Sequence, residues 1–457
     1  MITWLNFEQT CRSKSNVLVK VNPIINAVVE LYKEKALQKA EEVDEYLEKC
    51  DQNELNQLEF SKPLLGIPFT CKDMFDVKDT KTTLGNWWKK ENVSTTTHLV
   101  IRRMIDAGAI LIAKTTTSED CMWIESSNPL NGTTGNPYDT RKNAGGSSGG
   151  EGALIAAAGS LLGIGSDFAG SIRIPAALNG VYGLKTTSGV LPLSEFLDNP
   201  VESKMAVFGP ITRFPEDLNL VLKLFTKELS NQNRRVKTIH IPTFARVPWM
   251  EHYSIEAQES SRSIVTILQK AFNANISYIN LSKIQSKYID ILVAYFNDYP
   301  LKNKNRKATL AGFYEEHEKF HWITEIPKWF TGKSRHSLGS IFDYHALDRM
   351  YDDEKKNELI TCVSEFRADF DQILGEDSII VHPTWPRGAA FHHGEIPYFN
   401  YIHTGIYNIL NLPVVALPYG VDNEGMPLSV SIIGPNGSDG WLVELAEMIE
   451  REKEAHK

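Results

Sequence analysis

A segment rich in glycine and serine, residues 145–173, constrains the fold of this chain more than any other stretch of its sequence. It begins Gly-Gly-Ser-Ser-Gly-Gly, contains the short apolar run Leu161–Gly165, and later reads Ser-Asp-Phe-Ala-Gly-Ser up to Ser171. Glycine lets a backbone turn sharply and approach its neighbours closely. The segment therefore predicts a small-residue helix at Ser147–Ser160, then a strand, then a tight turn. Strand and helix patterns alternate along the rest of the chain, which predicts one large α/β sheet domain.

Two serines in this segment and one lysine before it are the residue types of a serine hydrolase. Ser171 is the candidate nucleophile because it ends the tight turn, where backbone N–H groups could bind an oxyanion. A nucleophilic serine needs a base, and the candidates here are Ser147 and Lys72 rather than a histidine. Lys72 follows the apolar run 64–71, which suggests burial, and burial lowers a lysine pKa and favours the neutral amine.

Each of these residues also has a simpler structural interpretation. The turn at Ser171 could only connect a strand to a helix, and Ser147 could be the N-cap of that helix. Most lysines are solvated surface charges, and Lys72 could be one of them. The residue types alone leave these alternatives open, and the wider set of motifs favours the hydrolase.

The order of the motifs resembles the amidase signature family. The match runs from about Pro63 to Asp217 and resumes more weakly at His382–Thr384 and Gly405–Gly434. Within the family, residues 118–128 and 398–405 are most similar to members that hydrolyse fatty-acid amides. The matching positions are Lys72, Gly85, Glu119, Ser126–Pro129, Gly135–Pro137, Gly145–Gly152, Asp167, Gly170–Pro175, Gly180, Gly183–Lys185, Gly209 and Pro210.

The resemblance implies a large twisted mixed β-sheet covered by α-helices on both faces. It implies a single amidase domain over 1–457, with the signature core at 63–217, and neither a cofactor nor a metal. The catalytic residues would be a Ser-Ser-Lys triad that forms a serine acyl-enzyme. The expected site residues are Lys72, Ser147 and Ser171 for catalysis, Phe168, Ala169, Gly170, Ser171, Cys121 and Met122 for oxyanion and substrate binding, and Asp167 and Arg173 as a structural ion pair.

Two positions depart from the family pattern: Lys185–Thr187 lacks the proline often found after that lysine, and Ala169 stands where glycine or threonine is commoner. The second departure bears on the turn. If that position requires a positive φ, alanine would be strained there.

The composition excludes several classes of protein. A chain of 457 residues with 42% hydrophobic residues can bury a large core, and a net charge of −9 argues against a nucleic-acid-binding surface. Five cysteines without metal-like spacing favour a reducing compartment. No signal peptide and no apolar run long enough for a transmembrane segment is found. We expect an intracellular protein, cytoplasmic or peripherally associated with membranes, and leave pairing into a homodimer open.

Two further interpretations concern particular segments. Apolar residues at helical spacing predict one long helix over Pro23–Lys49. Residues from about 285 to 348 carry no family motif, and we interpret them as a variable cap over the site. Its aromatic residues could pack a core, line a channel for a long acyl chain or face a membrane; they are Tyr288, Tyr295, Phe296, Phe313, Tyr314, Phe320, Trp322, Trp329 and Phe330.

The leading hypothesis is a hydrolase of linear carboxylic amides whose substrate is a small, lipid-like amide. One alternative is the A subunit of a glutamyl-tRNA(Gln) amidotransferase, which would use the same serines and pass ammonia to partner subunits. Another is a non-catalytic binding protein on the same fold, although intact Lys72, Ser147 and Ser171 speak against it.

Overall fold

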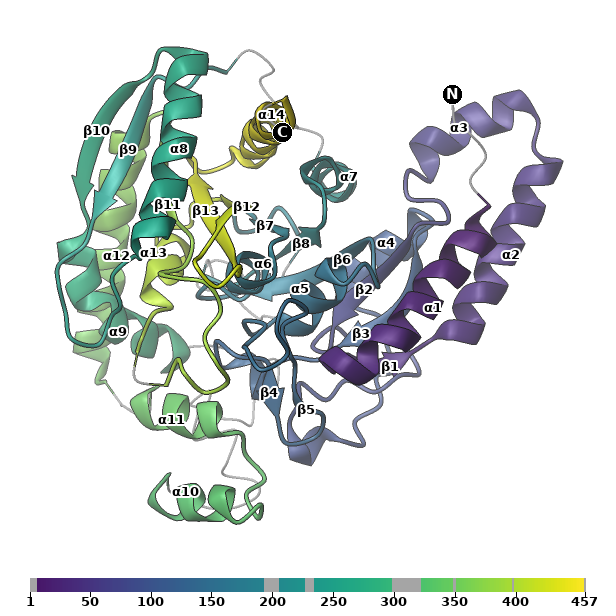
Figure 1. The fold of residues 1–457 in the computed structure, drawn as a ribbon, viewed down its shortest axis with the longest axis horizontal. Coiled ribbons are helices and arrows are strands. Elements are labelled where there is room, and N and C mark those ends of the chain that lie inside the picture. The colour runs from purple at the N-terminus through teal and green to yellow at the C-terminus, as the bar shows by residue number, and fades with distance from the viewer. Residues whose placement is uncertain are drawn as a thin grey trace.

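The computed structural model describes residues 6–192, 205–226, 234–297, 322–347, 351–396 and 398–455. An 11-stranded mixed sheet runs through these residues, and helices cover both of its faces (Figure 1). This arrangement confirms the predicted fold class. Across the sheet the strands are β1 (Val28–Leu31), β3 (Ile110–Thr115), β2 (Pro68–Lys72), β6 (Leu162–Asp167), β8 (Val207–Thr212), β7 (Tyr182–Lys185), β12 (Val414–Val421), β13 (Pro427–Ile433), β11 (Ser378–Pro383), β9 (Thr238–Thr243) and β10 (Asn275–Asn280).

Parallel and antiparallel pairs alternate in blocks along the sheet. Strands β3, β2 and β6 are parallel neighbours, and so are β11, β9 and β10. The strands between these two blocks, from β8 to β13, pair in antiparallel fashion. A separate two-stranded ribbon joins β4 (Ser127–Asn128) and β5 (Gly132–Thr133).

Alternate residues of the central strands supply two hydrophobic cores, one on each face. In β11, Ile379 and Val381 pack with helices of one face, whereas Ile380 packs with those of the other, as the two-residue repeat of a strand requires. The first face carries α4 (Leu99–Asp106), α7 (Pro215–Phe225), α8 (Ile255–Phe272) and α14 (Asp439–Ala455). The second carries α5 (Gly149–Ala156), α6 (Arg173–Asn179), α9 (Ser282–Asn297), α12 (Asp353–Leu374) and α13 (Ile402–Ile409).

The prediction of one helix over Pro23–Lys49 is wrong. The structure has α1 (Phe7–Ile25), the edge strand β1 and α2 (Lys33–Lys49), followed by α3 (Gln52–Ser61). Asn26 ends α1 in the left-handed region, with φ 49° and ψ 53°, a conformation that asparagine tolerates better than most residues. The next residues, Val28 and Val29, are β-branched and favour the strand that pairs with β3.

Besides β1, three further strands of the sheet, β7, β8 and β13, were not anticipated from the sequence. Strand β8 contains both Gly209 and Pro210, residues that are depleted in strands. It is nevertheless bonded to β6 on one side and to β7 on the other, so tertiary pairing outweighs the local preference.

The expected cap contains the C-terminal part of α9 together with α10 (Trp322–Phe330) and α11 (Leu338–Leu347). Phe313, Tyr314 and Phe320 lie outside the described residues. Tyr288 on α9 is fully buried in the core, whereas α10 projects from the body of the molecule and exposes Phe330 (Figure 1). Among the described residues, no helix combines the length and the apolar character needed to cross a lipid bilayer.

Candidate active site

Lys72 is the last residue of β2, and the alternation along this strand decides where its side chain lies. Phe69 and Cys71 pack into the core beneath α4, so Thr70 and Lys72 point to the opposite face, toward α5. There the Thr70 hydroxyl donates to Glu151 of α5 at 2.6 Å. The Lys72 side chain is completely buried.

The amine of Lys72 contacts two serines. Its Nζ donates to Ser147 Oγ at 2.6 Å and to Ser166 Oγ at 2.9 Å. Burial lowers the pKa of Lys72, and this effect outweighs the opposing attraction of Cys121 and Asp167. The lysine therefore loses its proton more readily than a solvated lysine does, as a base must.

Ser147 does not cap the helix that follows it. The N-cap of α5 is Ser148, and no side-chain capping bond is formed there. Instead Ser147 Oγ faces Lys72, and the Ser147 carbonyl accepts from Ser126 Oγ at 3.0 Å. The next N–H, that of Ser148, donates to the Ser171 carbonyl at 3.1 Å. The backbones of the two candidate serine segments are thus in direct contact.

The turn between β6 and α6 is held by Asp167. Its carboxylate accepts from the Gly170 and Ile172 N–H groups at 2.8 and 3.2 Å and forms an ion pair with Arg173 at 2.8 Å. Burial alone would raise the Asp167 pKa, but the charge of Arg173 and its hydrogen bonds hold that pKa below its usual range. The carboxylate therefore stays ionised and keeps the turn in one shape.

Arg173 also ties this turn to α13. Its guanidinium, fully buried, donates to the Thr404 carbonyl at 2.7 Å and to Asn408 Oδ1 at 2.5 Å. The Asn408 amide in turn donates to Asp167 Oδ1 at 2.9 Å. A buried charge needs this degree of pairing and hydrogen bonding to be tolerated.

Gly170 has a φ of +130°, a backbone conformation that essentially only glycine adopts. A Cβ atom there would also clash with the Thr404 side chain. Ala169 is not among the residues with positive φ, so the strain that we considered for alanine at this position is absent. Its carbonyl accepts a hydrogen bond from Thr404 Oγ1 at 2.5 Å.

The four N–H groups expected to bind an oxyanion are not equivalent. That of Gly170 is already bonded to Asp167, so this member of the predicted set points elsewhere. The N–H groups of Ala169 and Ser171 have no hydrogen-bond partner within the described part of the chain. These two N–H groups are therefore available to a ligand.

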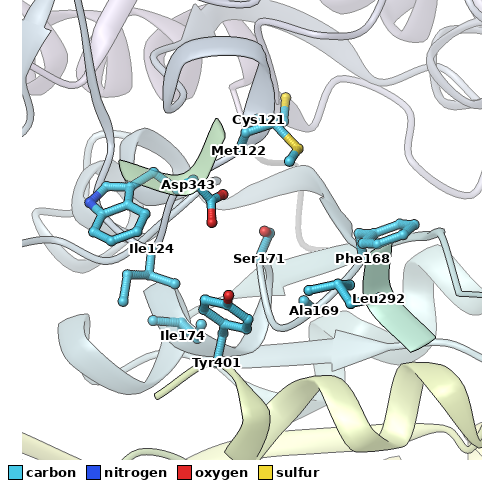
Figure 2. A pocket seen from close by; sticks show the side chains of 11 residues that line it. Cys121, Met122, Ile124, Phe168, Ala169, Ser171, Ile174, Leu292, Asp343 and Tyr401 are labelled. Atoms are coloured by element: carbon cyan, nitrogen blue, oxygen red, sulfur yellow. The ribbon is translucent and has the colours of Figure 1, made fainter. Parts of the chain in front are cut away.

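A small cavity of about 60 Å³ adjoins Ser171 (Figure 2). Five of its lining residues were anticipated from the sequence: Ser171, Phe168, Ala169, Cys121 and Met122. The other lining residues were not anticipated, and they are Trp123, Ile124, Ile174, Leu292, Asp343 and Tyr401.

Two helices of the expected cap, α9 and α11, line the cavity, but not with the aromatic residues that we considered for this role. They supply Leu292 from α9 and Asp343 from α11. Among the described residues, none of the cap aromatics lines the cavity; Trp329, for example, packs its ring against Phe330 and His393.

Other residues that contact the site were also missed, although the sequence held a signal near some of them. Thr404 lies within the stretch 398–405 that resembles fatty-acid amide hydrolysing members, so its neighbourhood was marked although its role was not. Ser166 precedes Asp167 at the end of β6, on the strand next to Lys72. In the described ranges, no group of three or more histidine, cysteine or acidic side chains is placed to hold a metal ion.

The fold and these side chains have the form of an amidase. The sequence profile of the amidase family matches residues 16–443, and the chain belongs to this family. It is accordingly an amide-hydrolysing enzyme.

Comparison with individual relatives shows which kinds of amidase this chain resembles. Fatty-acid amide hydrolase 2 of Homo sapiens is 30% identical over 450 residues, covering 95% of this chain and 84% of the relative. Fatty-acid amide hydrolase 2-A of Danio rerio is 33% identical over 449 residues, covering 94% and 83%. The A subunit of the glutamyl-tRNA(Gln) amidotransferase of Natranaerobius thermophilus is more distant, at 28% over 464 residues, covering 93% and 88%. A solved fatty acid amide hydrolase shares the fold, with a TM-score of 0.77, 22% identity and coverage of 97% and 82%.

The first prediction concerns the ion pair that holds the turn. Replacing Arg173 by leucine leaves Asp167 as an unpaired buried charge, so we expect the free energy of unfolding to fall by roughly 3–5 kcal/mol. Urea denaturation measures this loss. Arg141→Leu is the matched control, because Arg141 forms an exposed pair with Asp139 and its loss should have little effect. Equal effects of the two substitutions would contradict the role given to Arg173.

Proposed function

We propose that this enzyme hydrolyses amides through a serine acyl-enzyme, with Ser171 as nucleophile, Ser147 as proton relay and Lys72 as base. The observation that carries the proposal is the buried amine of Lys72, 2.6 Å from Ser147 Oγ, at a backbone contact with the Ser171 segment. A buried lysine whose amine is bonded to hydroxyls rather than to a carboxylate suits proton transfer better than structural support.

In the acylation step, Ser171 Oγ attacks the amide carbonyl carbon. Its proton passes to Ser147, whose own proton passes to the neutral amine of Lys72. The oxygen of the tetrahedral intermediate gains negative charge and is bound by the Ala169 and Ser171 N–H groups. The C–N bond then breaks as Ser147 returns a proton to the departing nitrogen and is reprotonated by Lys72.

Deacylation repeats this route with water as the nucleophile. The relay of Lys72 and Ser147 takes a proton from the water, which attacks the ester carbon of acylated Ser171. The C–O bond to the serine breaks, the carboxylic acid leaves, and Ser171 recovers its proton.

We further propose that the substrates are amides with a long aliphatic acyl chain. The relatives named above are fatty-acid amide hydrolases, and much of the cavity wall is apolar, with Ile124, Ile174 and Leu292. A cavity of about 60 Å³ has room for only a few atoms, so a long chain would extend beyond it. The same proposal includes contact of the enzyme with a membrane surface, where such a lipid-like substrate would lie. It also includes pairing of two copies of the chain into a homodimer.

A role as the A subunit of an amidotransferase is the second candidate function, supported by the match to that protein of Natranaerobius thermophilus. It predicts that glutamine is the preferred amide and that partner subunits accompany the chain. The substrate comparison below separates the two.

The second prediction tests the nucleophile. Ser171→Ala should remove labelling by a fluorophosphonate probe and lower amide hydrolysis by more than about a thousandfold, because no other group replaces the nucleophile. Ser286→Ala, at an exposed serine of α9, is the control and should label like the parent enzyme. Unchanged labelling of the Ser171 variant, with the probe found on another serine, would reject the assignment.

The third prediction concerns pH. Lys72 is active when neutral, and the neutral fraction grows as pH rises through its pKa. Since burial lowers that pKa, the rate of Ser171 acylation should rise with pH and level off below the range of an ordinary lysine. Single-turnover acylation against pH measures this limb. Lys72→Met should abolish the limb together with most of the activity, and an unaltered profile in that variant would exclude Lys72 as the base.

The fourth prediction concerns the acyl chain. If the chain is bound in an apolar environment, each methylene contributes roughly 0.8 kcal/mol, about fourfold in kcat/KM. Measurements over amides of one amine with acyl chains from acetyl to oleoyl should therefore rise steeply and then level off. Glutamine and acetamide should be poor substrates. A preference for glutamine would favour the amidotransferase role instead.

A further inference from the structure

The cavity beside Ser171 has one strongly polar wall. The Asp343 carboxyl and the Tyr401 hydroxyl point into the same space as the Ser171 hydroxyl (Figure 2). Asp343 lies on α11 and is 7% exposed, while Tyr401, just before α13, is 5% exposed. Two elements remote in sequence thus bring two polar groups to the candidate nucleophile.

Neither of these groups has a hydrogen-bond partner among the described residues. The Tyr401 hydroxyl has no hydrogen-bond partner within the described ranges. Asp343 likewise has neither an ion pair nor a hydrogen bond there, and burial alone raises its pKa, to about 8. An ionised carboxylate in such a place is costly unless a cation or several donors reach it.

The cationic groups nearby are already engaged. Arg173 is bound to Asp167, Thr404 and Asn408, and the amine of Lys72 is bound to Ser147 and Ser166. Other buried carboxyls around the site do have partners: Glu119 accepts from the Ser337 N–H at 2.8 Å. Asp343 is therefore a buried acid at this site that has no partner among the described residues and is open to a ligand.

The residues that line the cavity indicate the chemistry of a ligand that would bind Asp343. An ammonium group has three donors and no acceptor, which suits a carboxylate and a phenolic oxygen. The apolar side chains beside them, Ile124, Ile174 and Leu292, suit the methylenes that carry such a group. A purely hydrocarbon group beside the polar wall would leave Asp343 and Tyr401 unsatisfied, so the long acyl chain proposed above would follow the apolar side chains and leave this wall to the ammonium group.

We propose that the cavity selects amides that carry a primary ammonium group on a short alkyl stem, with Asp343 as the residue that binds the ammonium and Tyr401 as a second acceptor. This proposal rests on the function proposed above, because that function places the scissile bond at Ser171, next to the cavity. The ammonium belongs either to the acyl part or to the departing amine, and the experiment separates these two sources.

The fifth prediction compares matched substrates in which a methyl group replaces the ammonium. The acyl pair is 6-aminohexanoyl and heptanoyl p-nitroanilide, and the amine pair is N-(4-aminobutyl)hexanamide and N-pentylhexanamide. In one of the pairs kcat/KM should be about 10- to 100-fold higher for the ammonium compound, as expected for hydrogen bonds to a charged group. Asp343→Asn should reduce this preference to about twofold or less.

Two controls accompany this comparison. Asp353→Asn removes the same charge from a side chain that is 98% exposed and should keep the preference. Fluorophosphonate labelling of Ser171 should proceed in the Asp343 variant, which shows that the fold and the nucleophile are intact. Equal kcat/KM within both pairs for the parent enzyme would overturn the proposal.

A binding measurement makes the inference independent of turnover. Calorimetry with n-propylammonium on Ser171→Ala should give binding that weakens at least tenfold when Asp343→Asn is added. Equal binding with and without Asp343 would overturn the proposal. If amine binding depends on Asp343 while neither these four amides nor any amide of the acetyl-to-oleoyl series is hydrolysed, the ammonium site stands and the proposed hydrolytic function fails.

Discussion

The buried ion pair between Asp167 and Arg173 is the interaction on which the rest of the site depends. One carboxylate fixes the N–H groups of Gly170 and Ile172, and therefore decides which N–H groups of the turn remain available to a ligand. One guanidinium ties the same turn to α13 through Thr404 and Asn408. The energetic cost of burying two charges is offset only because nearly every donor and acceptor of the pair is used. The turn is therefore held in one shape before any substrate arrives.

A second constraint comes from the strand that carries Lys72. The two-residue repeat of β2 sends its apolar side chains to one core and leaves Lys72 on the side of α5, in a fully buried position. The groups that accept from its Nζ at 2.6 and 2.9 Å are serine hydroxyls, which cannot neutralise a charge. A lysine in this setting is driven toward its neutral form by the fold itself, which is the form that the proposed role as base requires.

The sequence was sufficient where the signal is local. The small-residue helix, the strand after it and the tight turn at Asp167 were each predicted from adjacent residues of the segment 145–173. It failed where the outcome depends on distant partners. Strand β8, with Gly209 and Pro210, is a strand because two neighbours bond to it. Leu292 and Asp343 were missed because they come from segments without a motif, and Tyr401, although it lies in the marked stretch 398–405, meets them only in the folded cavity.

The ties of Arg173 also bear on how the protein is made. Its partners Thr404 and Asn408 lie 231 and 235 residues further along the chain. At roughly 5–20 residues per second of synthesis, about 10 to 50 seconds pass between the emergence of the turn and that of α13. During this interval the Asp167–Arg173 pair lacks the carbonyl and amide that complete it. The ribosome therefore makes most of the chain before this turn can reach its final form.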